Sequence, residues 1–212
     1  MQQKKLVMDI KEKIVVGAEK LFHEKGFKSV TMDFLAKSMS MSKRTIYENY
    51  TDKNELIKAV INRRTATINQ NLFKLLLNAN NVFDAMCQFS EMYHEQMKSF
   101  NPVIAEDLKK YYSDILRESK RENDETNLKI VNVMLTKGVQ EGSFDNKLNI
   151  DIACRTFSML TNYMHELSEE YTNKNDIFYS GFIPYIKGIC TPQGKELLND
   201  TMKRLSIMTE NK

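Results

Sequence analysis

The chain has 212 residues, enough for one large domain or two smaller ones, and glycine (7) and proline (3) are so scarce that the composition predicts an all-α protein. No window holds 18 uninterrupted apolar residues, and the charged start lacks the apolar core of a signal peptide, so we expect a cytoplasmic protein without membrane spans. The net charge of +3 is uneven: residues 1–64 carry 14 Lys and Arg against 8 Asp and Glu, whereas the remainder carries 17 against 20. This asymmetry either marks a polyanion-binding first part or is a chance feature of a solvated surface.

The first predicted helix begins after Asp9, which forms a capping-box pattern with Glu12, and ends before Gly26. One face of this segment is apolar at a spacing of three or four residues, as an amphipathic helix requires. The residues that make this face are Ile10, Ile14, Ala18, Leu21 and Phe22.

Two short helices should follow. Thr31 is a suitable N-cap for a helix over 32–39, a turn is expected at Ser40–Met41, and Ser42 is a suitable N-cap for a helix over 43–49. Asp52 with Glu55 repeats the capping-box spacing and opens a longer fourth helix.

Helical patterns continue to the end of the chain, and the total is about nine to ten helices. A bend is expected near Gly181 and Pro184, where regular helix is difficult to continue. The later predicted helices cover 82–100, a short segment from Pro102 to Tyr112 with Asn101 as N-cap, 113–141, 150–171, 176–189 and a final helix from Pro192.

A helix, a tight turn and a short second helix form the helix-turn-helix unit of DNA-binding proteins. The segment 43–49 is about 10 Å long, short enough to enter a major groove about 12 Å wide, and its positive N-terminal end favours phosphate. Arg44 and Thr45 are placed for base or phosphate contacts; the alternative is a solvated helix with its tyrosine rings packed inward. The candidate DNA-binding residues are Thr31, Met41, Ser42, Lys43, Arg44, Thr45, Tyr47, Tyr50 and Lys53.

Residues 14–56 also resemble the DNA-binding half of the TetR-type transcriptional repressors. Two positions depart from the family pattern: Ser40 stands where glycine is usual in the turn, and Arg44 stands where a small residue is frequent. A left-handed Ser40 costs on the order of 1 kcal/mol, and Arg44 leaves the target sequence open. The matching positions are Leu21, Phe22, Gly26, Thr31, Leu35, Ala36, Ser42, Ile46, Tyr47, Tyr50 and Lys53.

The resemblance implies a helix-turn-helix DNA-binding domain over residues 1–52 and a helical effector-binding and dimerisation domain over residues 53–212. It further implies a homodimer that binds a double-stranded DNA operator and is released, as a repressor, by an unknown small-molecule effector.

Apolar and aromatic residues of the second domain are candidates for its two implied surfaces, although each could equally fill the core of one protomer. The ligand-pocket candidates are Met86, Phe89, Tyr93, Tyr111, Tyr112, Met134, Tyr163 and Met164. The dimer-interface candidates are Phe157, Leu160, Leu167, Phe178, Phe182 and Tyr185.

Nothing in the sequence indicates catalysis, a cofactor or a metal. The three histidines lack the spacing of a zinc-protease motif, no glycine-rich phosphate loop is present, and the three cysteines form no CxxC pair. We expect reduced, buried cysteines rather than a redox sensor. The main alternative function is a ligand- or partner-binding helical protein whose degenerate helix-turn-helix no longer binds DNA.

Overall fold

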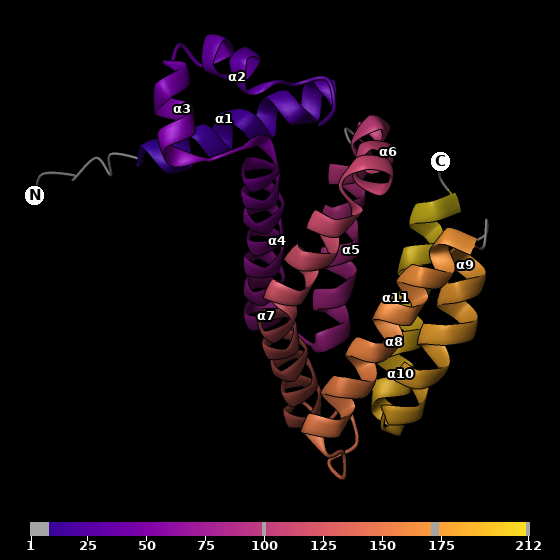
Figure 1. The fold of residues 1–212 in the computed structure, drawn as a ribbon. Coiled ribbons are helices and arrows are strands. Elements are labelled where there is room, and N and C mark those ends of the chain that lie inside the picture. The colour runs from indigo at the N-terminus through magenta and orange to yellow at the C-terminus, as the bar shows by residue number, and fades with distance from the viewer. Residues whose placement is uncertain (1–8, 99–100, 171–173, 211–212) are drawn as a thin grey trace, which may run out of the picture. The chain divides into compact units, whose positions relative to one another are not determined.

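A computed structural model describes residues 9–98, 101–170 and 174–210 (Figure 1). This described part is all-α, as predicted, and apart from helices it contains an isolated bridge between Phe144 and Cys190. The first seven helices are α1 (Ile10–Lys25), α2 (Met32–Ser38), α3 (Lys43–Asn49), α4 (Lys53–Asn78), α5 (Val82–Lys98), α6 (Pro102–Tyr111) and α7 (Ser113–Gln140). The remaining elements are α8 (Ile150–Glu170), α9 (Lys174–Ile177), a π-helical turn η1 (Phe178–Phe182), α10 (Ile183–Ile189) and α11 (Pro192–Glu210).

The expected bend near Gly181 and Pro184 takes the form of the π turn η1, which joins α9 to α10 without a break. A π turn widens the helix by one residue and is a common way to accommodate an irregular segment. If α9, η1 and α10 are taken as one interrupted helix, the described residues form ten helices, within the predicted range.

Contacts divide the chain into two compact units, which are described separately below. The amino-terminal unit comprises Met1–Thr67 and Gln96–Asn123, and the carboxy-terminal unit comprises Ile68–Glu95 and Asp124–Lys212. The division between the units falls within α4, α5 and α7. The first unit is therefore larger than residues 1–52, and the boundary of the DNA-binding function stays a prediction.

Side-chain caps and a turn motif define α2 and α3. Phe34 N–H donates to the Thr31 hydroxyl (3.1 Å), and Thr45 N–H donates to that of Ser42 (3.0 Å). Ser40 has φ 52°, and the bonds from Ser40 N–H to the Lys37 carbonyl and from Met41 N–H to that of Ala36 complete a Schellman motif around it. The turn therefore keeps its left-handed residue although serine replaces glycine.

The capping box predicted at the start of α1 is not formed. Asp9 occupies the N-cap position, but its side chain accepts no capping hydrogen bond. At the other end of the helix Gly26 has φ 79° and its N–H donates to the Phe22 carbonyl, as the cap prediction required.

The core of the amino-terminal unit joins α1–α4 to α6. Ile14, Leu35, Ile46 and Leu56 have no exposed surface, and Ile104 brings α6 into the same cluster. Burying such side chains contributes roughly 1.5–3 kcal/mol each, so this cluster fixes the position of α3 in the unit.

Polar contacts also hold α6 within this unit. The buried carboxylate of Asp107 accepts a hydrogen bond from Lys28 N–H (2.7 Å), and the Asn101 side chain donates to the His23 carbonyl (3.0 Å). The Tyr112 ring meets Phe27 edge-on at 6.0 Å. Sequence periodicity alone does not indicate these contacts, because the partners lie far apart along the chain.

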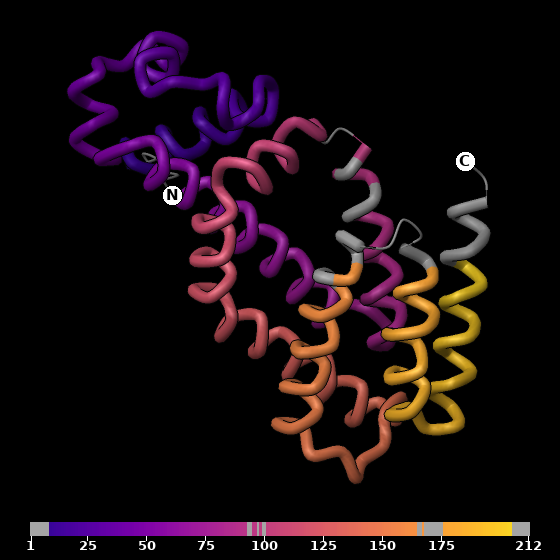
Figure 2. Tube along the Cα trace, turned by 45° about the vertical axis from the view of Figure 1, so that its right-hand side comes forward, coloured from indigo at the N-terminus to yellow at the C-terminus, as the bar shows by residue number. Residues whose placement is uncertain are grey.

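The carboxy-terminal unit has its own core, in which Figures 1 and 2 show α8, α10 and α11 as neighbouring helices. Phe83 and Phe144 meet edge-on at 5.6 Å, and Phe157 meets Phe182 at 5.4 Å. Leu135 is completely buried in the same cluster. Apolar burial of this kind stabilises the unit through many small packing contacts.

The three cysteines predict a first measurement, because Cys87, Cys154 and Cys190 are free and buried. Burial raises the pKa of each thiol, that of Cys190 to about 11, so little thiolate is present at pH 8. We expect an aromatic disulfide reagent at pH 8 to label the native protein slowly, and to label all three thiols rapidly in denaturant. Rapid labelling of any thiol in the folded protein would contradict this prediction.

Candidate nucleic-acid interface

Helix α3 presents one polar face to solvent. Its inward side is fixed by Ile46, which is fully buried, whereas Lys43, Arg44, Tyr47 and Glu48 are exposed. At about 100° per residue, these four side chains share one arc of the helix. Two cations and an aromatic ring therefore lie together on a surface that a nucleic acid can approach.

Each cation of this face has a carboxylate partner. The Lys43 ammonium pairs with Asp33 of α2, and Arg44 Nε donates to Glu48 Oε1 at 2.7 Å. Such exposed pairs contribute roughly 0–1 kcal/mol, so DNA phosphates can replace them at little cost. The hydroxyls of Ser42 and Thr45 also form a hydrogen bond (2.8 Å).

Thr31 and Met41 frame α3. Thr31 is exposed at the start of α2, where its hydroxyl is already the N-cap acceptor, so it offers a phosphate its hydroxyl proton and the free N–H groups of the first turn. Met41 is half-buried and packs against the amino-terminal core, which makes it a support for α3 more than a contact residue.

Tyr50 does not fit its predicted role as a phosphate contact. Its side chain is only 3% exposed, and its hydroxyl donates to the Lys11 carbonyl at 3.4 Å. Burial raises the pKa of this phenol to about 12. The ring follows α3 on the same inward side as Ile46, so it packs in the core, as the alternative interpretation of the motif allowed.

Lys53 is partly withdrawn from solvent at the start of α4. Its ammonium donates to the Lys28 carbonyl (3.2 Å) and lies 6.0 Å from the centre of the Tyr112 ring. Burial lowers the pKa of this ammonium. Lys53 thus has a structural role within the unit, and its proposed phosphate contact would have to compete with these partners.

The exposed surface around α3 also carries two acidic residues, Asp33 and Glu48, which are not among the predicted DNA-binding residues. Asp33 and Glu48 were overlooked because nucleic-acid binding is usually sought in positive charge. The signal was available for Glu48, since Arg44 and Glu48 are four residues apart on a predicted helix. No spacing in the sequence indicates the pair of Asp33 with Lys43, because the two residues lie in different helices.

The ligand-pocket candidates are divided between the two units. Tyr111 and Tyr112 belong to the amino-terminal unit, where the Lys28 ammonium donates to the Tyr111 hydroxyl (2.9 Å). Met134 is buried in the carboxy-terminal core, and Met86 and Met164 pack against it. Phe89 is half-buried in α5, and the Tyr93 side chain lies outside the described residues.

One candidate, Tyr163, does line a hollow of about 640 Å³ along α7 and α8. Ser158, whose buried hydroxyl has no hydrogen-bond partner among the described residues, lines the same hollow. The complete lining is Asp124, Asn127, Leu128, Val131, Arg155, Ser158, Met159, Thr161, Asn162 and Tyr163.

The dimer-interface candidates mostly face inward. Phe157 and Phe182 are buried in the core of the carboxy-terminal unit, and Leu160, Phe178 and Tyr185 pack against that core. Leu167 is half-buried. For the first two, the alternative that they fill the core of one protomer is the one that the structure supports.

A different face of α8 is exposed instead. Ile152, Met159 and Tyr163 are each more than half exposed and recur at spacings of seven and four residues, so they form one stripe along the helix. We call these three residues the outer α8 stripe.

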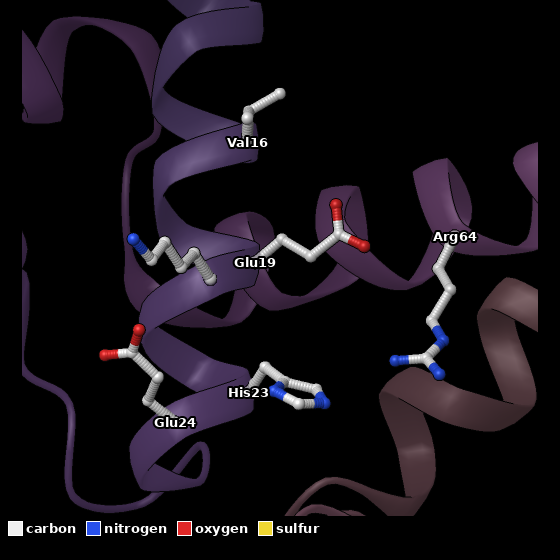
Figure 3. A pocket seen from close by; sticks show the side chains of 6 residues that line it. Val16, Glu19, His23, Glu24 and Arg64 are labelled. Carbon is white, nitrogen blue, oxygen red and sulfur yellow. The ribbon is translucent and has the colours of Figure 1, made fainter. Parts of the chain in front are cut away.

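A second hollow, of about 430 Å³, lies beside α1 in the amino-terminal unit (Figure 3). Glu19, His23 and Arg64 extend toward the same space, and Glu19 also pairs with Arg63 at 2.5 Å. Its walls mix both signs of charge, which gives the hollow no preference for an anionic or a cationic ligand. The lining residues are Val16, Glu19, Lys20, His23, Glu24 and Arg64.

Metal-binding clusters and membrane-spanning helices are both absent from the described part of the chain. Its His, Cys, Asp and Glu residues form no group of three or more that could hold a metal ion. None of its helices combines the length and apolar character that crossing a membrane requires.

Comparisons with known proteins agree with this architecture. Residues 14–60 match the sequence model of bacterial regulatory proteins of the tetR family. The uncharacterized HTH-type transcriptional regulator YvaF of Bacillus subtilis (strain 168) is 32% identical over 104 residues. That match covers 49% of this chain and 54% of the relative, so this chain matches about half of the relative's length.

Solved structures share the fold at low sequence identity. A TetR-family regulator from Pectobacterium atrosepticum gives a TM-score of 0.64 at 16% identity and covers 85% of this chain and 94% of that one. A TetR-family regulator from Cytophaga hutchinsonii gives a TM-score of 0.61 at 16% identity, and the match covers 87% of this chain and 98% of that one.

The described helices include a capped helix-turn-helix in the amino-terminal unit, the element with which many transcriptional regulators bind DNA. The Bacillus relative is itself an HTH-type transcriptional regulator. Residues 14–60, which include the helix-turn-helix, are similar to bacterial regulatory proteins of the tetR family.

Proposed function

We propose that this protein is a homodimeric, cytoplasmic repressor that binds a DNA operator through α2 and α3 and leaves it when a small-molecule effector binds. The exposed face of α3, with Lys43, Arg44 and Tyr47 directed away from the buried Ile46, is the observation that carries the proposal. Phosphate contacts would position the protein, and base contacts from α3 would select the sequence.

The set of residues that we propose to contact DNA is smaller than the set predicted from the sequence motif. Ser42, Lys43, Arg44, Thr45 and Tyr47 remain the contact residues that we propose. Thr31 would add a phosphate contact from the start of α2, Lys53 is a secondary candidate, and Tyr50 and Met41 support the helix from inside.

For the dimer, we propose the outer α8 stripe as the surface that a second protomer covers. Its three apolar side chains are exposed, whereas the candidates from the sequence fill the core. Exposed apolar side chains that line up on one helix commonly mark a protein–protein contact. The effector remains unassigned.

Substitution of Arg44 tests the proposed DNA binding. With DNA from upstream of its own gene, Arg44→Ala should weaken binding by about 5- to 150-fold, because one good base contact is worth roughly 1–3 kcal/mol. Fluorescence anisotropy at several salt concentrations measures this loss, and log affinity of the unaltered protein should fall steeply with log salt.

The control is Arg155→Ala, which removes another well-exposed arginine from α8 (70%, against 86% for Arg44) and should leave DNA affinity nearly unchanged. A salt-independent affinity, or equal losses for both variants, would count against DNA binding through α3. Such a result would favour the alternative that this helix-turn-helix serves a partner- or ligand-binding protein.

A further inference from the structure

We propose that Glu48 is a specificity-determining residue of the DNA interface, and that its carboxylate accepts a hydrogen bond from the amino group of cytosine or adenine in the major groove. The inference rests on the proposed function and adds the chemistry by which one base is chosen. Glu48 is not among the positions that carry the family resemblance, so the inference comes from its place in this structure.

The first step concerns position. Glu48 follows Arg44 by one helical turn, and both side chains leave α3 on the side opposite the buried Ile46. The Glu48 side chain is 57% exposed and the Arg44 side chain is 86% exposed. If α3 enters the major groove with this face, the Glu48 carboxylate enters with it.

The second step concerns charge. A surface that bound DNA by phosphate attraction alone would gain nothing from a carboxylate, because phosphates repel it and groove entry removes its water. This surface carries two carboxylates, Glu48 and Asp33, each paired with a cation. A hydrogen-bond donor on a base edge can replace the arginine that Glu48 gives up to DNA.

The third step concerns the bases. In the major groove, cytosine offers the N4 amino group and adenine the N6 amino group, whereas guanine and thymine offer acceptors there. The released Arg44 can in turn donate to guanine O6 and N7. The Arg44–Glu48 pair therefore suits a site in which an amino group and a guanine edge lie close together, and it disfavours guanine or thymine as the base that faces Glu48.

The experiment is selection of binding sites from random duplex DNA by the full-length protein, comparing the unaltered chain with Glu48→Ala and Glu48→Gln. Glu48→Ala should lose the preference at one base pair of each half-site and keep it at the others, whereas Glu48→Gln should favour adenine at that base pair, as glutamine does. The ratio of operator to scrambled-DNA affinity should fall about tenfold for Glu48→Ala.

Asp33→Asn is the matched control, since it removes the same charge from the same surface at a residue on α2. It should raise affinity for both DNAs by a similar factor and leave the selected sequence unchanged. If Glu48→Ala selects the same sites as the unaltered protein, or if Asp33→Asn alters one base pair as Glu48→Ala does, the base-reading role is wrong.

Failure of the inference is distinguishable from failure of the proposed function. If the unaltered protein selects no sequence and its affinity for DNA does not fall as salt is added, the proposed function as a DNA-binding regulator fails. If the unaltered protein selects a site that Glu48→Ala also selects, the regulator stands and Glu48 is only a surface charge.

Discussion

Gly194→Ala should destabilise the carboxy-terminal unit by about 3 kcal/mol or more, at the upper end of what overpacking costs. A Cβ atom at this position would lie 1.8 Å from the carbonyl oxygen of Ser143 and 2.7 Å from its carbon. That carbonyl already accepts from Thr191 N–H (3.1 Å), and Gly194 N–H donates to the Thr191 hydroxyl (3.0 Å). The first turn of α11 and the segment after α7 would therefore have to separate.

The measurement is thermal or urea unfolding followed by circular dichroism, where each kcal/mol shifts the melting temperature by about 2–4 °C in a chain of this size. Gly188→Ala is the matched control, because a Cβ atom there meets no heavy atom within 4 Å. Gly188 is the last residue but one of α10, where alanine should stabilise the helix by up to about 1 kcal/mol. Equal destabilisation by both substitutions would show that the Ser143 contact is not the cause.

Glutamate substitutions in the outer α8 stripe should separate the proposed dimer. Met159→Glu combined with Tyr163→Glu would place two carboxylates against their symmetry mates, because a two-fold interface uses the same patch on both protomers. The resulting monomer would lose the second half-site contact, and operator affinity should fall by at least about 100-fold. Sedimentation should change from about twice the 24.8 kDa protomer mass to that mass.

The control for this prediction is Leu77→Glu, since Leu77 of α4 in the same unit is as exposed as the stripe residues. It should leave the protein dimeric and bound to DNA. If Leu77→Glu dissociates the protein and the double variant does not, the dimer forms through another face. If the unaltered protein sediments as a monomer at micromolar concentration, the dimer proposal itself fails.

Local signals predicted the amino-terminal helices closely. Thr31 and Ser42 cap α2 and α3 as expected, and Gly26 and Ser40 adopt the left-handed conformations that their positions indicated. These features depend on residues a few positions apart, so composition and spacing are enough to find them. Asp9 is the exception, because its side chain forms no cap.

The candidate DNA-binding surface was predicted only in part, because local spacing shows which residues share a helix face but not which distant residues contact them. Lys43, Arg44 and Tyr47 are exposed as a short amphipathic helix allows. Tyr50 is buried because the chain after α3 turns back over α1, where Lys11 provides its hydrogen-bond acceptor and a cation 5.2 Å from the ring centre. Asp33 and Lys43 pair across a helix boundary, which no spacing rule connects.

The sequence by itself determined the helical class, the positions of the short helices and the likeness of residues 14–60 to the tetR family. Only the tertiary structure decided which apolar face of α8 is core and which is free. Phe157 and Leu160 point inward while Met159 and Tyr163 point outward, although all four are apolar or aromatic. Periodicity gives the angle between side chains around a helix axis, whereas the direction of burial is set by the helices that pack against it, and these come from distant parts of the chain.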